Sequence, residues 1–288
     1  VFMLLFSLSL SSQVAVDLAA IKDSLIILGE TIRDSPEFDK RKKANERFSF
    51  LLEEYLSFDE GYSDPLKEVQ TMVSVSEEDY DFRIFTWLLP DSLFQLKAYG
   101  MIAAKTRRGI QITSLEDQKR NLIEPEFLVL KPRQWYGAIY YKLITTKKGR
   151  KKIYTLLGYS PDKPIQRKIV EIISIDKRGR PKFGAKVFYI EDFMDKKFRK
   201  APMRLILSYS SEYSATVKWN EEEEMIIMDH LSPPNPRLKG LYDMYGPDMT
   251  YDGLEWDDDW WHLRPQVKFN SRQEIEFRPP DRPIGPEK

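Results

Sequence analysis

The sequence contains no cysteine and only two histidines, His230 and His262, among its 288 residues. The lack of cysteine excludes disulfide bonds, thiol catalysis, cysteine-ligated zinc and a lipid anchor on cysteine at a signal-peptide junction. Two histidines are too few for a histidine-rich metal site. The P-loop, G-x-G-x-x-G, G-x-S-x-G and H-E-x-x-H motifs are also missing, so no common nucleotide-binding or hydrolase signature applies.

An excess of charge of one sign is also lacking, because 45 Lys and Arg residues balance 45 Asp and Glu residues. This balance argues against a dedicated nucleic-acid-binding protein, which needs a basic surface to neutralise phosphates. The basic run at residues 147–150 is interpreted as a solvated turn, since no second basic stripe accompanies it. We therefore expect no nucleic-acid partner.

Long apolar runs are missing except at residues 1–10, VFMLLFSLSL, which small or polar residues follow. This pattern is typical of the apolar and cleavage regions of an export signal, although the usual basic residues are not present in the segment. The run is too short to span a bilayer. We expect an export-signal remnant at residues 1–13, no transmembrane segment in the mature chain, and location in the periplasm or at the cell surface. A buried N-terminal helix or strand is the alternative.

Apolar residues recur every three or four positions over residues 14–32, which predicts a helix with one apolar face. Ser35 is expected to cap a second helix that has its own apolar face. The two helices are predicted to form an antiparallel hairpin over residues 14–58, which either packs on the sheet or offers Leu18 and Leu25 to a partner. The basic residues 40–43 form either a solvated face or a contact with an anionic surface.

The densest strand pattern lies at residues 135–159, WYGAIYYKLITTKKGRKKIYTLLGY, and predicts a β-hairpin with a glycine in its turn. Strict alternation places Tyr141 and Leu143 on the same face of the first strand, and Leu156 and Leu157 on opposite faces of the second. Both faces are largely apolar. The hairpin is therefore expected to be covered on both sides or to belong to a closed, curved sheet.

Similar strand patterns recur every 8–12 residues or so, and no long helix separates them. The predicted class is mainly β with N-terminal α: an antiparallel meander of roughly ten strands, barrel-like or sandwich-like, preceded by the two-helix hairpin. The β domain is placed at residues 66–270. Residues 271–288 are rich in proline and are predicted to be a disordered tail.

The segment at residues 240–261, GLYDMYGPDMTYDGLEWDDDWW, combines many carboxylates with aromatic residues and is predicted to be a loop that packs on the sheet. Three hypotheses explain its carboxylates. They order the loop through local hydrogen bonds; or two of them hydrolyse glycosidic bonds; or several bind Ca²⁺, although the spacing is not that of an EF-hand. The calcium candidates are Asp248, Asp252, Glu255 and Asp257.

The two histidines carry no obvious chemistry in the sequence. His230 follows Asp229 directly in an expected strand end, and neighbours in a strand point to opposite faces, so these two residues do not form a catalytic dyad by themselves. His230 is therefore interpreted as a structural histidine. No residue is assigned a catalytic or cofactor-binding role.

A set of short motifs runs through the chain: 135–138 (WYGA), 154–159 (YTLLGY), 182–184 (KFG), 229–233 (DHLSP) and 245–248 (YGPD) with 251–253 (YDG). With these motifs the chain resembles an uncharacterised family of exported proteins from Bacteroidetes-type bacteria, over residues 82–261. The resemblance implies export and a single β-rich unit, and it names no catalytic residue. The incomplete signal segment is the one departure.

These observations favour an exported, non-enzymatic binding or scaffold protein of the bacterial cell envelope, whose partner is an envelope protein or a glycan. The alternatives are a carboxylate-dependent, glycan-directed envelope hydrolase or a calcium-binding protein that uses residues 243–259. A structure distinguishes them by showing whether the carboxylates lie buried against backbone amides or face an open groove.

Overall fold

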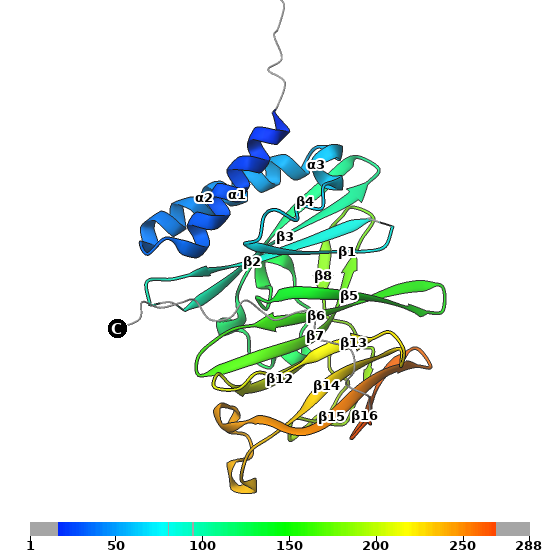
Figure 1. Cartoon of the computed structure of the whole chain (residues 1–288). Helices are drawn as coiled ribbons and strands as arrows, with labels where there is room; N and C mark the ends of the chain where they lie inside the picture. The colour runs from blue at the N-terminus through cyan, green and yellow to red at the C-terminus, as the bar shows by residue number, and fades with distance from the viewer. Residues whose placement is uncertain (1–16, 80, 94, 269–288) are drawn as a thin grey trace, which may run out of the picture.

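The computed structural model of the protein describes residues 17–79, 81–93 and 95–268. The expected export-signal remnant and C-terminal tail lie outside these residues. The described chain forms three α-helices and sixteen strands, which make three large sheets and one two-stranded ribbon. Figure 1 shows the helices and the three sheets stacked in four successive layers. The predicted class is confirmed, and within the described residues no sheet closes into a barrel.

The first layer is the predicted helical hairpin. Its elements are α1 (Leu18–Asp34), α2 (Phe38–Leu56) and the short α3 (Asp59–Ser63). Asp17 caps α1, because its carboxylate accepts a hydrogen bond from the Ala20 amide at 3.1 Å. The prediction that Ser35 caps α2 is wrong. The extended backbone of Ser35 ends α1, and α2 begins only after Glu37, which makes no side-chain cap.

The basic run at residues 40–43 is not a uniform solvated face, because Arg41 is only 2% exposed. Its guanidinium donates hydrogen bonds of 2.7–3.2 Å to four backbone carbonyls, those of Ser35, Pro36, Pro90 and Asp91. Two of these carbonyls lie just before α2 and two at the end of a strand. Arg41 therefore joins the helical hairpin to the first sheet.

Sheet one is the second layer and contains four antiparallel strands in sequence order (Figure 1). The strands are β1 (Met72–Ser76), β2 (Phe82–Pro90), β3 (Leu96–Thr106) and β4 (Gly109–Glu116). Phe85 and Trp87 pack against the helices, whereas Ile84 packs on the opposite face. Leu25 is fully buried in the core between the helices and this sheet, so it cannot serve as an interface residue.

Sheet two is the third layer, in the order β12-β7-β6-β5, with β8 paired to β7. The strands are β5 (Ile139–Lys148), β6 (Lys151–Ser160), β7 (Ile165–Ile175), β8 (Pro181–Phe183) and β12 (Arg204–Ser210). The predicted hairpin is β5–β6, and cover on both sides is confirmed, since Leu156 packs toward sheet one and Leu157 toward sheet three. Tyr141 and Leu143 do not share a face, because a bulge between Tyr140 and Lys142 shifts the alternation.

Sheet three is the fourth layer, in the order β13-β14-β15-β16-β9. The strands are β9 (Phe188–Tyr189), β13 (Val217–Asn220), β14 (Met225–Ser232), β15 (Gly246–Asp257) and β16 (Trp260–Arg264). The predicted loop at residues 240–261 is therefore wrong for most of its length, since it forms the β15–β16 hairpin. Aspartate is rare in strands, so the many aspartates of residues 240–261 suggested a loop. Here Asp248 lies at a bulge, Asp258 and Asp259 lie in the turn, and Asp252 has a side-chain partner.

Short elements complete the fold between these layers. The ribbon consists of β10 (Asp192–Phe193) and β11 (Lys196–Lys197). The 3-10 helices are η1 (Lys119–Asn121), η2 (Pro125–Phe127), η3 (Pro132–Gln134), η4 (Pro236–Leu238) and η5 (Tyr242–Met244). The ribbon and η5 meet, because the Tyr242 hydroxyl donates to the Met194 carbonyl at 3.0 Å. The ribbon and the 3-10 helices η1, η2, η4 and η5 contribute residues to the walls of two cavities.

Candidate functional site

A cavity of about 720 Å³ lies between sheet two, sheet three and the β10–β11 ribbon. Binding sites for small molecules commonly have volumes of about 300–1,000 Å³. Its apolar wall includes Phe193, Met194, Leu207, Met228, Leu231 and Leu263. Its polar groups include Asp195, Lys197, Asp229, His230, Lys239 and Asp252. We call this cavity the His230 cleft.

His230 and Asp252 form the central pair of the His230 cleft. They lie on the neighbouring strands β14 and β15, where Asp252 is directly opposite Met228, so that His230 reaches it along a diagonal. The His230 Nδ1 atom lies 2.7 Å from Asp252 Oδ2. The other Asp252 oxygen accepts a hydrogen bond from the Gln266 amide at 3.1 Å. Asp252 is 7% exposed, so two partners hold it in place while the imidazole faces the cleft.

A bulge explains why Asp229 and His230 both line the cleft although they are neighbours in a strand. Asp229 pairs with Tyr251, but Leu231 pairs with Pro247, so β15 contributes two extra residues to the stretch opposite His230. Bulges of this kind reorient side chains next to functional sites. The prediction that Asp229 and His230 do not form a dyad stands, because the partner of His230 is Asp252. The interpretation of His230 as a structural histidine stays a prediction, and the structure adds that its side chain lines the cleft.

The charges around His230 favour its protonated form. The hydrogen bond with Asp252 raises the pKa of His230 against the opposing effect of burial, and the charges of Asp252, Asp248 and Asp195 add to the increase. Burial raises the pKa of Asp229, although hydrogen bonds from Thr216 oppose this effect. The cleft therefore combines a histidine that holds its proton more tightly than usual with a carboxyl group that is harder to ionise than usual.

The Nε2 atom of His230 is the group that can act on a ligand. It lies 3.9 Å from Asp248 Oδ2, which is longer than a hydrogen bond. In the neutral ring, the contact with Asp252 favours a proton on Nδ1 and leaves a lone pair on Nε2; in the protonated ring, Nε2 donates. The pair can therefore either hydrogen-bond a ligand hydroxyl or exchange a proton with it.

The structure brings together two of the four predicted calcium ligands. Asp248 and Asp252 both lie beside His230, whereas Glu255 pairs with Arg264 at 2.7 Å and Asp257 ends β15 opposite Trp260. Across the described chain, no three His, Asp or Glu side chains are arranged so that they could hold a metal ion. The calcium assignment stays a prediction. The pairing of His230 with Asp252 was missed because strand register decides it, and register is not visible in composition.

Comparison with known proteins gives no relative: no protein-family model, no curated protein sequence and no solved structure matches this chain. The resemblance to an exported bacterial family therefore stays a prediction. Among the helices of the described residues, none combines the length and the apolar character needed to cross a membrane.

The raised pKa of His230 gives a pH-dependent contribution to stability. An unfolded histidine has a pKa near ~6.5. The folded state binds the proton more tightly, so the stabilisation is complete below this pH and disappears as the pH rises through the folded pKa. We expect the melting-temperature advantage of the wild type over His230→Gln to shrink between pH 6 and pH 9, as measured by calorimetry. The imidazole is half exposed, so solvent screening keeps the effect below ~1 kcal/mol. An advantage that grows with pH contradicts the assignment.

Proposed function

We propose that this chain is an exported, non-enzymatic binding protein of the bacterial cell envelope, and that the His230 cleft holds a hydroxyl-rich segment of an envelope glycan. The observation that carries the proposal is the set of polar side chains that line the cleft. The carboxylates of Asp195, Asp229 and Asp252 already have protein partners, but each keeps lone pairs that can accept a further hydrogen bond. His230 and Lys239, which pairs with Asp195 at 3.0 Å, are the donors. Sugar hydroxyls donate and accept hydrogen bonds, so they suit a surface that presents both kinds of group.

The apolar wall supports the same class of ligand. Carbon-bound hydrogens of a sugar ring form apolar patches, and these can lie against side chains such as Phe193 and Leu207 while the hydroxyls meet the polar groups. A strongly anionic ligand fits less well, because carboxylates outnumber cations among the polar groups around His230. A neutral glycan meets no such repulsion.

The proposal is tested with solubilised glycan fragments from a bacterial envelope and isothermal titration calorimetry. We expect His230→Ala to weaken binding by about tenfold or more, because a hydrogen bond from a charged group contributes about 1.5–3 kcal/mol. His262→Gln is the matched control, since this second histidine lies on β16 outside the cleft and its substitution should leave affinity unchanged. Equal affinity for the wild type and His230→Ala contradicts the proposal.

A glycan-directed hydrolase is the second candidate, and the pairing of Asp252 with His230 favours it. A carboxylate that orients a histidine is the arrangement used by general acids and bases. The two functions separate in one assay of reducing ends released from the same fragments. A hydrolase predicts turnover that Asp252→Asn lowers by about 100-fold or more while binding persists. A binding protein predicts no turnover by any variant.

A further inference from the structure

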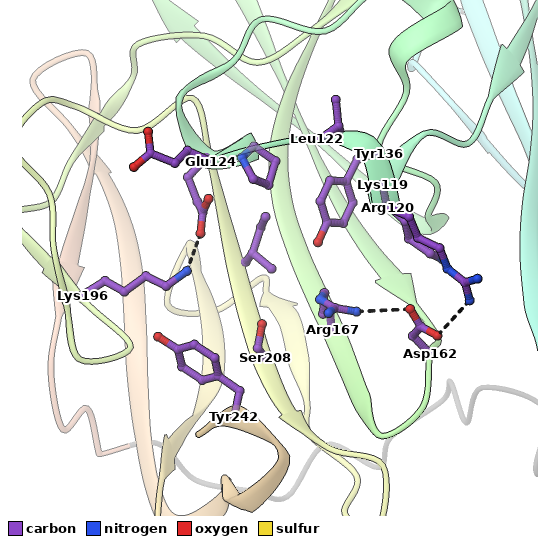
Figure 2. Close-up of a pocket in the computed structure, with 13 residues that line it drawn as sticks. Lys119, Arg120, Leu122, Glu124, Tyr136, Asp162, Arg167, Lys196, Ser208 and Tyr242 are labelled. Carbon is purple, nitrogen blue, oxygen red and sulfur yellow. Dashed lines mark hydrogen bonds and ion pairs between the residues drawn. The ribbon is translucent and has the colours of Figure 1, made fainter. Parts of the chain in front are cut away.

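A second cavity of about 390 Å³ lies on the opposite face of β12 from the His230 cleft. Strand alternation separates the two, because Leu207 lines the His230 cleft whereas Ile206 and Ser208 line the second cavity. Figure 2 shows side chains from several distant parts of the chain converging on it. We call it the Arg167 pocket.

Two hydroxyl groups in the Arg167 pocket have no partner. Tyr136 is 4% exposed and Ser208 is partly exposed, and no hydrogen bond joins the hydroxyl of either residue to another residue that the structure describes. A hydroxyl that opens on a cavity without a protein partner is available to hydrogen-bond a ligand. Burial raises the pKa of Tyr136, so this hydroxyl remains a donor at neutral pH. In Figure 2 it points toward Arg167, and both groups face the cavity.

Arg167 also has donors to spare. One of its terminal nitrogens donates to the Ile165 carbonyl at 3.2 Å and lies 3.7 Å from Asp162, a loose ion pair. Its remaining N–H groups make no hydrogen bond within the described residues. A guanidinium presents a planar fork of N–H groups that matches the two oxygens of a carboxylate. Arg167 is therefore placed to bind a carboxylate together with the Tyr136 hydroxyl.

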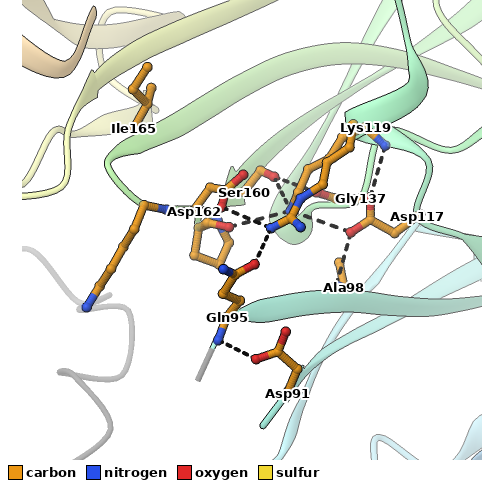
Figure 3. A network of polar contacts seen from close by, with 12 residues as sticks. Asp91, Gln95, Ala98, Asp117, Lys119, Gly137, Ser160, Asp162 and Ile165 are labelled. Carbon is orange, nitrogen blue, oxygen red and sulfur yellow. Dashed lines mark hydrogen bonds and ion pairs between the residues drawn. The ribbon is translucent and has the colours of Figure 1, made fainter. Parts of the chain in front are cut away.

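A network of polar contacts connects the residues of the wall beside Arg167, as Figure 3 shows. Lys119 donates to Ser160 at 3.2 Å, and Ser160 donates to the Gly137 carbonyl at 2.7 Å. Arg120 donates to Gln95 at 2.8 Å. These contacts place two further basic side chains beside the pocket, of which Lys119 is buried and Arg120 is exposed.

We propose that the Arg167 pocket binds a small organic molecule through its carboxylate. Arg167 takes the carboxylate, and the hydroxyls of Tyr136 and Ser208 donate to its oxygens. The rest of the molecule lies against Leu122, Ile206 and the ring of Tyr242. This site is separate from the His230 cleft and does not depend on the function proposed for that cleft.

Asp162 provides a test that distinguishes a carboxylate-binding pocket from a pocket with a structural role alone. Its carboxylate lies 3.5 Å from Arg120 and 3.7 Å from Arg167, so it competes with a ligand carboxylate for both cations. Removing this negative charge should strengthen carboxylate binding. Removing the Arg167 charge should weaken it.

The test uses calorimetry of the full chain with succinate, glutamate and glucuronate, each paired with a neutral counterpart: succinamide, glutamine and glucose. We expect at least one carboxylate to bind and its neutral counterpart to bind at least tenfold more weakly. Arg167→Gln should lower that affinity by about tenfold or more, Tyr136→Phe by about threefold to tenfold, and Asp162→Asn should raise it. Tyr136→Phe keeps the fold intact, because the hydroxyl it removes has no protein partner.

Three results overturn the proposal. The first is that no carboxylate binds more tightly than its neutral counterpart. The second is that affinity survives Arg167→Gln in a variant whose circular dichroism and melting temperature match those of the wild type. The third is that inorganic phosphate binds and displaces every carboxylate, which would reassign the pocket to phosphate.

Discussion

Replacing Arg204 by methionine is expected to lower the free energy of unfolding by about 3–5 kcal/mol, because it leaves the Glu171 carboxylate buried without its partner. The Arg204 Nε atom donates to Glu171 at 2.9 Å, and both side chains are fully buried. Arg204 also donates to the carbonyls of Pro125 and Phe183. The Tyr140 hydroxyl donates to the second Glu171 oxygen, so one carboxylate connects three strands of sheet two.

Urea unfolding followed by tryptophan fluorescence measures this effect. The matched control is the double variant Glu171→Leu with Arg204→Met, which removes both charges together. We expect it to be more stable than Arg204→Met alone, since the cost of the single change comes from the uncompensated charge. A loss below ~1 kcal/mol in the single variant would mean that the pair contributes little.

Replacing Gly137 by alanine is expected to cost about 3 kcal/mol. Gly137 has a φ of +73°, a region that costs other residues roughly 1–2 kcal/mol. The remainder arises because a Cβ atom at this position would overlap the Asp117 carboxylate. That carboxylate accepts hydrogen bonds from the amides of Ala98 at 3.2 Å and Lys119 at 3.1 Å, so it cannot move without breaking them (Figure 3).

Gly149→Ala is the matched control for this prediction. Gly149 also has a positive φ, +57°, but nothing lies within 4 Å of the position its Cβ would take. It should therefore lose only the roughly 1–2 kcal/mol of the left-handed backbone. Equal losses for the two variants would show that the contact with Asp117 has no energetic effect. Because the Lys119 amide donates to the Asp117 carboxylate, a shift of this carboxylate in Gly137→Ala should also move Lys119 and weaken binding in the Arg167 pocket.

The local parts of the fold were predictable from sequence. The period of three to four residues located the helical hairpin, and the apolar faces of residues 135–159 correctly indicated a hairpin covered on both sides. The bulge at Tyr140–Lys142 was not predictable, because a strand pattern carries no signal for one inserted residue. The composition of residues 240–261 was misleading, since turn-forming residues sit at a bulge and a hairpin turn within long strands.

The candidate site was only partly predictable. Asp248 and Asp252 were singled out as carboxylates, but their meeting with His230 depends on the register of β14 against β15. The Arg167 pocket could not be recognised in the sequence, because the residues that line it come from strands, 3-10 helices and turns across the chain. Long-range pairing decides such sites, and a single sequence shows only local periodicity.

The position of the β10–β11 ribbon between the two cavities has a thermodynamic consequence. Lys196 lines the Arg167 pocket, while its neighbours Asp195 and Lys197 line the His230 cleft. The ribbon is tied to η5 and to Tyr245, whose hydroxyl donates to Asp195 at 2.6 Å. A ligand that displaces this shared wall when it binds in one cavity therefore changes the shape of the other cavity. Linkage then requires reciprocity: the factor by which occupancy of one cavity alters affinity in the other holds in both directions.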